Sequence, residues 1–296
     1  MRTCSVVIPV YNSEETLTPL LEQLAAALPG FCARHEVILV NDSSRDNSWV
    51  VEKLAQRYPW VRGINLMRNY GQHNALLCGI RTARYELIIT MDDDLQHPPE
   101  VLAALVAKLD EGPYDVVYGT PLQEQHGFLR DMASQVTKLA LQSAMGAETA
   151  RKVSALRVFR TQLRDAFVRY HAPFVSIDVL LTWGTTRFAA VPVAHAPRAA
   201  GRSNYTFRKL VTHALNMTTG FSVMPLQLAS LLGFGLALFS VVVLVYVIGR
   251  YLLEGTPVQG FPFLASIIGI FSGAQLLALG IIGEYLARMH FRVMDK

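Results

Sequence analysis

Three consecutive carboxylates, Asp92, Asp93 and Asp94, directly follow the apolar run 88–91 and are the residues of this chain best suited to chemistry. Neighbouring anions repel one another, and a hard divalent cation bound through oxygens, such as Mg2+ or Mn2+, relieves that repulsion. In an extended chain, Asp92 and Asp94 point to one side and Asp93 to the other. The pattern therefore predicts an Asp-x-Asp metal clamp at a strand end. The simpler alternative is a solvated acidic turn.

Short runs rich in Val and Ile alternate with amphipathic stretches before and after this triplet. The expected strands are 5–10, 36–40, 61–66, 86–91 and 115–118, and the expected helices are 14–28, 46–58, 72–83 and 98–111. This alternation predicts an α/β fold, with a mostly parallel sheet and helices on both faces. Ligands of such sheets bind beyond the carboxyl ends of the strands. Polar segments follow the first four strands, so we expect a nucleotide and metal site at that edge.

The C-terminal part of the chain is apolar enough to cross a membrane. No Asp, Glu, Lys or Arg occurs in residues 210–249 or 255–283. The segments 225–248 and 261–283 each match the roughly 20 residues that a spanning helix needs. Two buried helices of a soluble core are the alternative, although such helices usually carry a polar stripe. Pro225 divides the first stretch and leaves 206–224 as a helix expected to lie on the membrane surface.

Charge and cysteine usage indicate where the chain resides. A hairpin of two spans places both ends on one side, and the basic segments 198–209 and 288–296 make that side the cytoplasm. The N-terminus does not resemble a signal peptide. The formal net charge of +4 is modest and favours anionic lipid over nucleic acid. The three cysteines, without Cys-x-x-Cys spacing, are expected to be reduced thiols.

At these motifs the whole chain resembles the family 2 glycosyltransferases of GT-A fold. Within that family it is similar to the polyprenyl-phosphate sugar transferases, which include dolichyl-phosphate mannose and glucose synthases and undecaprenyl-phosphate aminoarabinose transferases. The resemblance is carried by Pro-Val-Tyr-Asn at 9–12, by the segment 91–100, and by the two spans that end in Gly-Glu-Tyr-Leu at 283–286. Arg-Asn-Tyr-Gly-Gln-His at 68–73 looks most like the aminoarabinose transferases.

The resemblance implies a donor site at the carboxyl edge of the sheet. Pro9 and Tyr11 would line the nucleobase pocket, and Asp42 would accept a hydrogen bond from the base. The donor would be a UDP or GDP sugar. The ligands implied for the metal at the diphosphate are Asp92, Asp94 and Gln96. From the residues alone, Tyr11 could instead be core packing and Asp42 a turn-former.

The resemblance also implies an acceptor site for a polyprenyl monophosphate, undecaprenyl phosphate. Arg198 and Ser203 match the family segment that holds the acceptor phosphate, and Arg130 matches an arginine near the same pocket. Arginine offers a bidentate fork for phosphate, which fits this chemistry. From the sequence alone, Arg130 is equally compatible with a solvated helix charge.

Several departures from the family pattern lie on the sugar and acceptor side. Asp-Asp-Gly-Ser is replaced by Asn-Asp-Ser-Ser at 41–44, and Arg151 stands where many relatives have an acid. The arginine that commonly follows the fifth strand is absent from 119–121. Asp178 could be a catalytic base, or a surface or helix-capping residue. These departures leave the identity of the sugar open.

The family mechanism implies a single displacement with inversion at the anomeric carbon. The acceptor phosphate is already an anionic nucleophile, so no strong general base is required. The metal, Asp94, Arg130, Arg198 and Ser203 would place the reactants and stabilise the leaving group. The product would be a lipid-linked sugar for modification of cell-envelope glycan or lipid, made at the cytoplasmic face of the inner membrane by a multi-pass protein. The sequence leaves the oligomeric state open, with a homo-oligomer as one alternative.

We expect three parts: a catalytic domain at 1–205, the surface helix at 206–224, and two spans with a basic tail at 225–296. Two alternatives remain at this point. A processive polysaccharide synthase resembles the catalytic half, but it carries Gln-x-x-Arg-Trp and more spans, which this chain lacks. A catalytically inactive membrane scaffold subunit would keep the fold without the activity.

Overall fold

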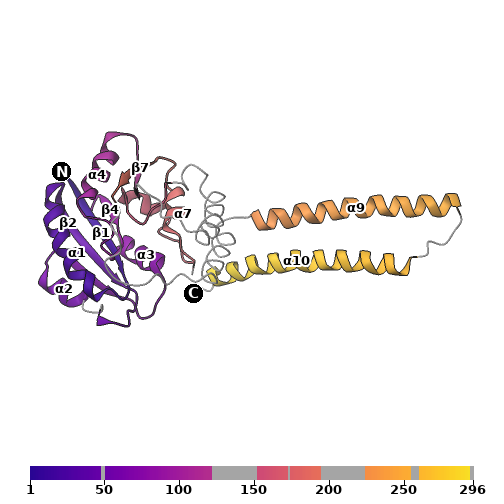
Figure 1. Cartoon of the computed structure of the whole chain (residues 1–296), viewed down its shortest axis with the longest axis horizontal. Coiled ribbons are helices and arrows are strands. Elements are labelled where there is room, and N and C mark those ends of the chain that lie inside the picture. The colour runs from indigo at the N-terminus through magenta and orange to yellow at the C-terminus, as the bar shows by residue number, and fades with distance from the viewer. Residues whose placement is uncertain (48–50, 122–151, 173, 195–223, 255–259, 294–296) are drawn as a thin grey trace. The chain divides into compact units, whose positions relative to one another are not determined.

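The computed structural model describes the chain except for residues 48–50, 122–151, 173, 195–223, 255–259 and 294–296 (Figure 1). Its contacts divide the chain into two compact units, Met1–Ala214 and Leu215–Lys296. The first contains the sheet and the second contains two long helices. The expected surface helix at 206–224 falls, apart from Met224, outside the described residues.

The first unit is built on a seven-stranded sheet in the order β3-β2-β1-β4-β6-β5-β7. The strands are β1 (Arg2–Val10), β2 (Cys32–Asn41), β3 (Val61–Asn65), β4 (Leu87–Thr90), β5 (Val116–Pro121), β6 (Arg157–Arg160) and β7 (Phe188–Val193). All neighbouring pairs are parallel except those that β6 makes with β4 and β5. The prediction of a mostly parallel sheet is confirmed, and β6 and β7 add two strands to the five expected.

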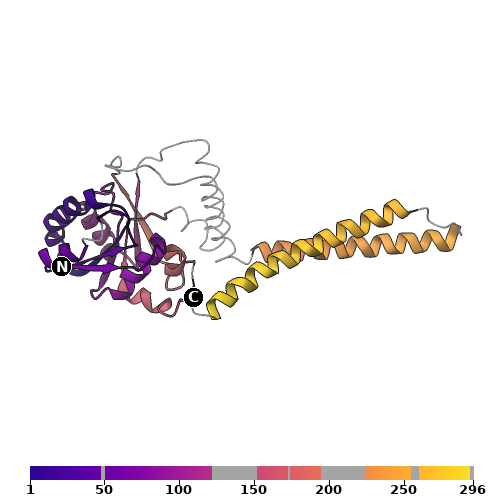
Figure 2. The same cartoon turned by 90° about the horizontal axis from the view of Figure 1, so that it is seen from below.

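Helices cover both faces of this sheet, as the alternation of apolar runs predicts (Figures 1 and 2). They are α1 (Glu14–Ala27), α2 (Val51–Arg57), α3 (Gln72–Thr82), α4 (Val101–Glu111) and α7 (Ile177–Thr182), with 3-10 segments η1 (Leu28–Gly30) and η3 (Thr161–Ala166). The main core lies under α1, α2 and α4 and takes alternate β1 residues, including Val6 and Ile8. The intervening residue Val7 faces α3 on the other side. This alternation is the two-residue period of a strand buried on both faces.

The first two cysteines differ from expectation, because Cys4 and Cys32 are joined by a disulfide. They lie on the adjacent parallel strands β1 and β2, near a register irregularity, with Cα atoms 6.1 Å apart. That separation suits a disulfide. The prediction of reduced thiols is therefore wrong for this pair, because sequence spacing does not reveal strand register. In a reducing compartment the same register keeps the two thiols next to each other. Cys78 is a free thiol, and burial raises its pKa.

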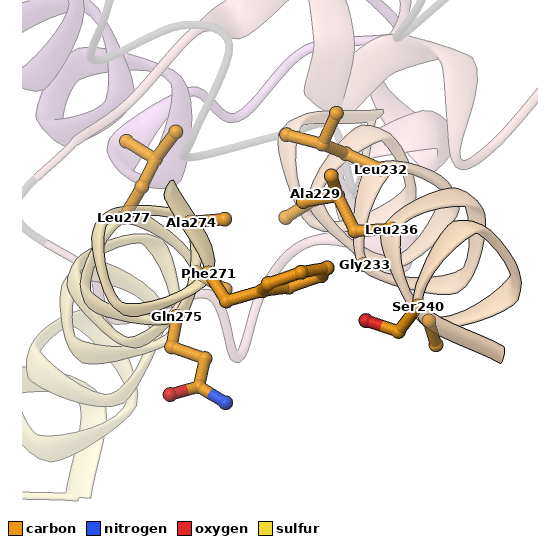
Figure 3. A pocket seen from close by; sticks show the side chains of 11 residues that line it. Ala229, Leu232, Gly233, Leu236, Ser240, Phe271, Ala274, Gln275 and Leu277 are labelled. Carbon is orange, nitrogen blue, oxygen red and sulfur yellow. The ribbon is translucent and has the colours of Figure 1, made fainter. Parts of the chain in front are cut away.

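The second unit consists of α9 (Met224–Glu254) and α10 (Phe261–Val293), which run alongside each other (Figures 1 and 2). They contain the stretches Pro225–Arg250 and Ile270–Ala287, with mean hydropathies of 2.7 and 1.5, which are long and apolar enough to cross a membrane. Neither stretch is buried inside the protein, which argues against the alternative of two core helices. A cavity of about 380 Å³ lies between the helices, and Phe271 of α10 extends across it toward Gly233 of α9 (Figure 3).

The packing of α3 on the sheet generates a stability prediction. A Cβ atom at Gly79 would overlap the Val7 side chain and lie 3.1 Å from Val40 Cγ2. We expect Gly79→Val to lower the free energy of unfolding by about 1–3 kcal/mol, as overpacking does, and the thermal midpoint by about 2–4 °C per kcal/mol. Gly30→Val is the matched control, because no atom lies within 4 Å of a Cβ there. Thermal unfolding of the detergent-solubilised chain measures both, and equal midpoints would contradict the close packing.

Candidate active site

The parallel strands β1, β2, β3 and β4 end at one edge of the sheet, and the segments that follow them are joined by hydrogen bonds. The loop after β1 is bound to the loop after β2, because Asn12 N–H donates to Ser44 Oγ at 3.0 Å and Arg45 N–H donates to Asn12 Oδ1 at 2.8 Å. Asn12 has a positive φ of 55°, a conformation that asparagine tolerates better than most residues. The expected convergence of polar strand ends is thus present in the structure.

The acidic triplet follows β4 at this edge, and its first two side chains contact different elements, the start of α3 and the loop after β1. Gln72 Nε2 donates to Asp92 Oδ1 at 2.7 Å, whereas the Tyr11 N–H donates to Asp93 Oδ2 at 3.2 Å. Asp94 Oδ1 accepts the backbone N–H of Gln96 at 3.1 Å. Asp92 and Asp93 thus contact different elements, but the chain bends at residues 93–95 and is no longer a strand there. The triplet is therefore a set of oriented carboxylates rather than a freely solvated turn.

Asp93 differs from its neighbours because it supports the loop that contains Tyr11. Burial raises the pKa of the Asp93 carboxyl, hydrogen bonds from Ser13 and from the Tyr11 N–H lower it, and the charge of Asp94 raises it. The net direction is upward. Since Asp93 contacts the loop after β1, it has a structural function at the site, and Asp92 and Asp94 stay the predicted metal ligands.

The triplet does not by itself enclose a metal ion. Within the described part of the chain, no group of three His, Cys, Asp or Glu side chains is arranged to hold one. Mg2+ in nucleotide sites is usually bound by one or two carboxylates and completed by substrate phosphates and water. Asp92 and Asp94, with the half-buried Gln96 nearby, fit that kind of shared site better than an all-protein cage.

Asp42 follows β2 and is only 3% exposed. Its Oδ1 accepts the Tyr70 N–H at 2.7 Å and its Oδ2 accepts the Gly71 N–H at 2.8 Å. Burial raises the pKa of Asp42, and these two bonds partly offset that effect. Asp42 therefore fixes the loop before α3, a function that the sequence did not indicate. Each carboxylate oxygen can accept a second hydrogen bond, so contact with a nucleobase is compatible with this geometry.

Pro9 and Tyr11 lie at the end of β1 and just beyond it. Pro9 is buried within the strand, whereas the Tyr11 side chain is 39% exposed. Its exposure excludes the alternative that Tyr11 is a core residue. A partly exposed aromatic ring on a loop that is hydrogen-bonded to its neighbours is suited to stacking on a planar ligand.

A buried ion pair that the sequence did not reveal lies beside the triplet. Arg157 and Asp178 are 2% and 4% exposed, and Arg157 Nη1 lies 2.6 Å from Asp178 Oδ1. Tyr118 Oη donates to the same carboxylate oxygen at 3.1 Å, and burial raises the pKa of Tyr118 well above its usual value. Arg157 pairs with Thr90 across β6 and β4, two residues before Asp92. A surface position for Asp178 is therefore wrong, and its charge is balanced by Arg157.

All three expected acceptor residues lie outside the described residues. Arg130 falls in 122–151, and Arg198 and Ser203 fall in 195–223. Their assignment to the acceptor phosphate stays a prediction from the sequence.

Two solved structures show the same fold at low sequence identity. TarS of S. aureus in complex with UDP-GlcNAc is 20% identical, with a TM-score of 0.51 over 75% of this chain and 71% of that one. Glucosyl-3-phosphoglycerate synthase of Mycobacterium tuberculosis, in complex with Mn2+, UDP-glucose and phosphoglyceric acid, is 18% identical. Its TM-score is 0.54 over 74% of this chain and 78% of that one. The fold of the first unit is therefore GT-A.

Sequence comparison identifies the family. The undecaprenyl-phosphate 4-deoxy-4-formamido-L-arabinose transferase of Shewanella sediminis is 37% identical over 290 residues, which cover 97% of this chain and 87% of that protein. The model of glycosyl transferase family 2 matches residues 5–170, a range that contains both the triplet and the buried Arg157. The chain is a glycosyltransferase that belongs to glycosyl transferase family 2.

Proposed function

We propose that this enzyme transfers a sugar from a nucleotide diphosphate sugar to undecaprenyl phosphate, with inversion at the anomeric carbon. The observation that carries the proposal is the 37% identity, over 97% of the chain, to a protein described as an undecaprenyl-phosphate 4-deoxy-4-formamido-L-arabinose transferase. The two apolar helices support it, because an acceptor with a polyprenyl chain resides in a membrane. We take the 4-formamido pentose as the first candidate for the donor sugar.

On the donor side, Asp92, Asp94 and Gln96 would hold Mg2+ or Mn2+ against the diphosphate. When bound, such an ion supplies Lewis-acid stabilisation of the leaving diphosphate. Pro9 and Tyr11 would contact the nucleobase, and Asp42 would accept a hydrogen bond from it. We favour UDP over GDP because the two GT-A neighbours were solved with UDP sugars.

On the acceptor side, Arg198 and Ser203 would hold the lipid phosphate, and Arg130 would screen its charge from the donor diphosphate. A phosphate oxygen bonds to the anomeric carbon as the bond from that carbon to the diphosphate oxygen breaks. The nucleophile is already ionised, so no side chain has to remove a proton. The pairing of Asp178 with Arg157 supports this scheme, because a carboxylate that balances a buried guanidinium is poorly placed to act as a base.

The arrangement in the membrane is inferred from the two apolar helices and the basic segments that flank them. We propose that α9 and α10 form a two-span hairpin and that the catalytic domain, 1–205, faces the cytoplasm of the inner membrane. The basic segments that flank the hairpin in sequence support this orientation through the positive-inside tendency. Residues 206–224 would lie at the membrane surface, where a lipid phosphate is accessible, and residues 225–296 would provide the anchor.

The decisive experiment assays the purified chain with undecaprenyl phosphate and a panel of UDP and GDP sugars. We expect transfer from a UDP sugar, with the 4-formamido pentose preferred. We also expect loss of transfer in EDTA and in both Asp92→Asn and Asp94→Asn, because each change removes the cation site. Full activity in EDTA would contradict the metal site, and processive addition of sugars would instead indicate a polysaccharide synthase. Absence of transfer from every donor would favour a scaffold subunit.

A second prediction concerns Asp93. Asp93→Ala removes the acceptor of the Tyr11 N–H, so the loop at 11–13 should loosen. We expect faster deuterium exchange in this loop and roughly tenfold weaker UDP binding, the equivalent of about 1.4 kcal/mol. Asp110→Ala is the matched control, because it removes an exposed carboxylate that binds Arg2 at the opposite edge of the sheet. Unchanged exchange and UDP affinity in Asp93→Ala would show that the loop does not depend on this bond.

A third prediction concerns the acceptor phosphate. Arg198→Lys keeps the charge but removes the bidentate fork, so transfer should fall by an amount that corresponds to about 1.5–3 kcal/mol. Kinetics with varied undecaprenyl phosphate at saturating donor measure the effect, and donor and metal binding should be preserved. If both Arg198→Lys and Arg198→Ala keep normal acceptor kinetics, Arg130 or Arg202 holds the phosphate instead.

A further inference from the structure

Gln72 is the first residue of α3, and its side chain reaches the acidic triplet. Its Nε2 donates to Asp92 Oδ1 at 2.7 Å, a short hydrogen bond that joins residues 20 positions apart in sequence. We infer, on the basis of the metal-dependent transfer proposed above, that Gln72 is a positioning residue that fixes the Asp92 carboxylate for the metal. It would act through Asp92, without contacting the metal itself.

The backbone that presents Gln72 is itself fixed. Gly71, at the N-cap of α3, has a φ of 90°, a conformation that favours glycine. The N–H groups of Tyr70 and Gly71 both donate to the buried Asp42, and the Gly71 carbonyl accepts the Asn74 N–H at 3.0 Å. Gln72 therefore extends from a segment whose position is determined on both sides. A donor held in this way can orient a neighbouring carboxylate with little additional loss of conformational entropy.

The bond from Gln72 restricts how Asp92 can face a cation. It is made to Oδ1 and therefore limits the rotation of the carboxylate about its Cβ–Cγ bond. An amide is a suitable donor for this purpose because it is neutral. A lysine or arginine at position 72 would neutralise Asp92 and oppose the binding of a second cation by charge repulsion. The amide instead stabilises the carboxylate and leaves its negative charge in place.

Asp92 and Asp93 are thus anchored from opposite sides. Gln72 holds Asp92 from the α3 side, and the Tyr11 N–H holds Asp93 from the β1 side. Together, these two hydrogen bonds fix the directions in which the adjacent carboxylates point. Hydrogen bonds to metal-ligating groups commonly change metal affinity or activity by about 10–100-fold when removed. Loss of the Gln72 amide should therefore weaken metal binding and leave the fold intact.

The test measures Mn2+ binding directly, by electron paramagnetic resonance on the full chain in detergent with saturating UDP. Gln72→Met keeps the length of the side chain and removes the donor, and we expect Mn2+ affinity about 10–100-fold lower. The thermal midpoint should be unchanged, and excess Mn2+ should restore transfer activity. Gln23→Met is the matched control, because it makes the same exchange at an exposed position of α1.

Two results would overturn the assignment, and they are distinguishable. In the first, the unaltered chain binds Mn2+ in the presence of UDP and Asp92→Asn loses this binding, but Gln72→Met binds Mn2+ as tightly as the unaltered chain. Gln72 then has no positioning function, although the metal site is correct. If the unaltered chain does not bind Mn2+ with UDP, or if Asp92→Asn binds it equally well, the metal site itself fails and the function of Gln72 fails with it.

Discussion

The site depends on four carboxylates that stand at the ends of neighbouring parallel strands, namely Asp42, Asp92, Asp93 and Asp94. Parallel pairing of β2, β1 and β4 brings them to one edge, where their charges repel one another. The hydrogen bonds described above for these residues all come from neutral donors, which are backbone N–H groups, the Ser13 hydroxyl and the Gln72 amide. Neutral donors orient the carboxylates without cancelling their charge. These hydrogen bonds therefore do not reduce the negative charge on which the binding of a divalent cation depends.

In the buried ion pair beside this edge, by contrast, a positive charge balances the carboxylate. Asp178 is balanced by the full positive charge of Arg157 and by the hydroxyl of Tyr118, so it adds little net charge to the site. Breaking such a pair by removing one partner usually costs about 3–5 kcal/mol, because the other charge is left buried and alone. The pair connects β5, β6 and α7 next to the end of β4. It fixes the framework, whereas the hydrogen bonds described for the four edge carboxylates orient them without adding a positive charge.

Much of this edge could be predicted from the sequence because the signals are local. The alternation of apolar runs and amphipathic stretches predicted the parallel sheet, and the two-residue period of a strand predicted that Asp92 and Asp93 diverge. The rest depends on register between distant segments. β6 has only four residues and runs antiparallel, so no local pattern indicates that Arg157 lies beside Asp178. The proximity of Cys4 to Cys32 and the bond from Gln72 to Asp92 also join segments that are distant in sequence, so no local pattern predicts them.

Hydrogen bonds connect Asp42 to Asp92 through the segment 70–72. Asp42 holds Tyr70 and Gly71, the next residue is Gln72, and Gln72 holds Asp92. The residue proposed to contact the nucleobase is therefore linked to a proposed metal ligand through one short segment. Groups that share a hydrogen-bond network do not act additively, and their coupling is commonly about 0.5–3 kcal/mol. A base that settles against Asp42 would thereby favour the orientation of Asp92 that binds the metal, so recognition of the base and of the diphosphate would be coupled within the protein.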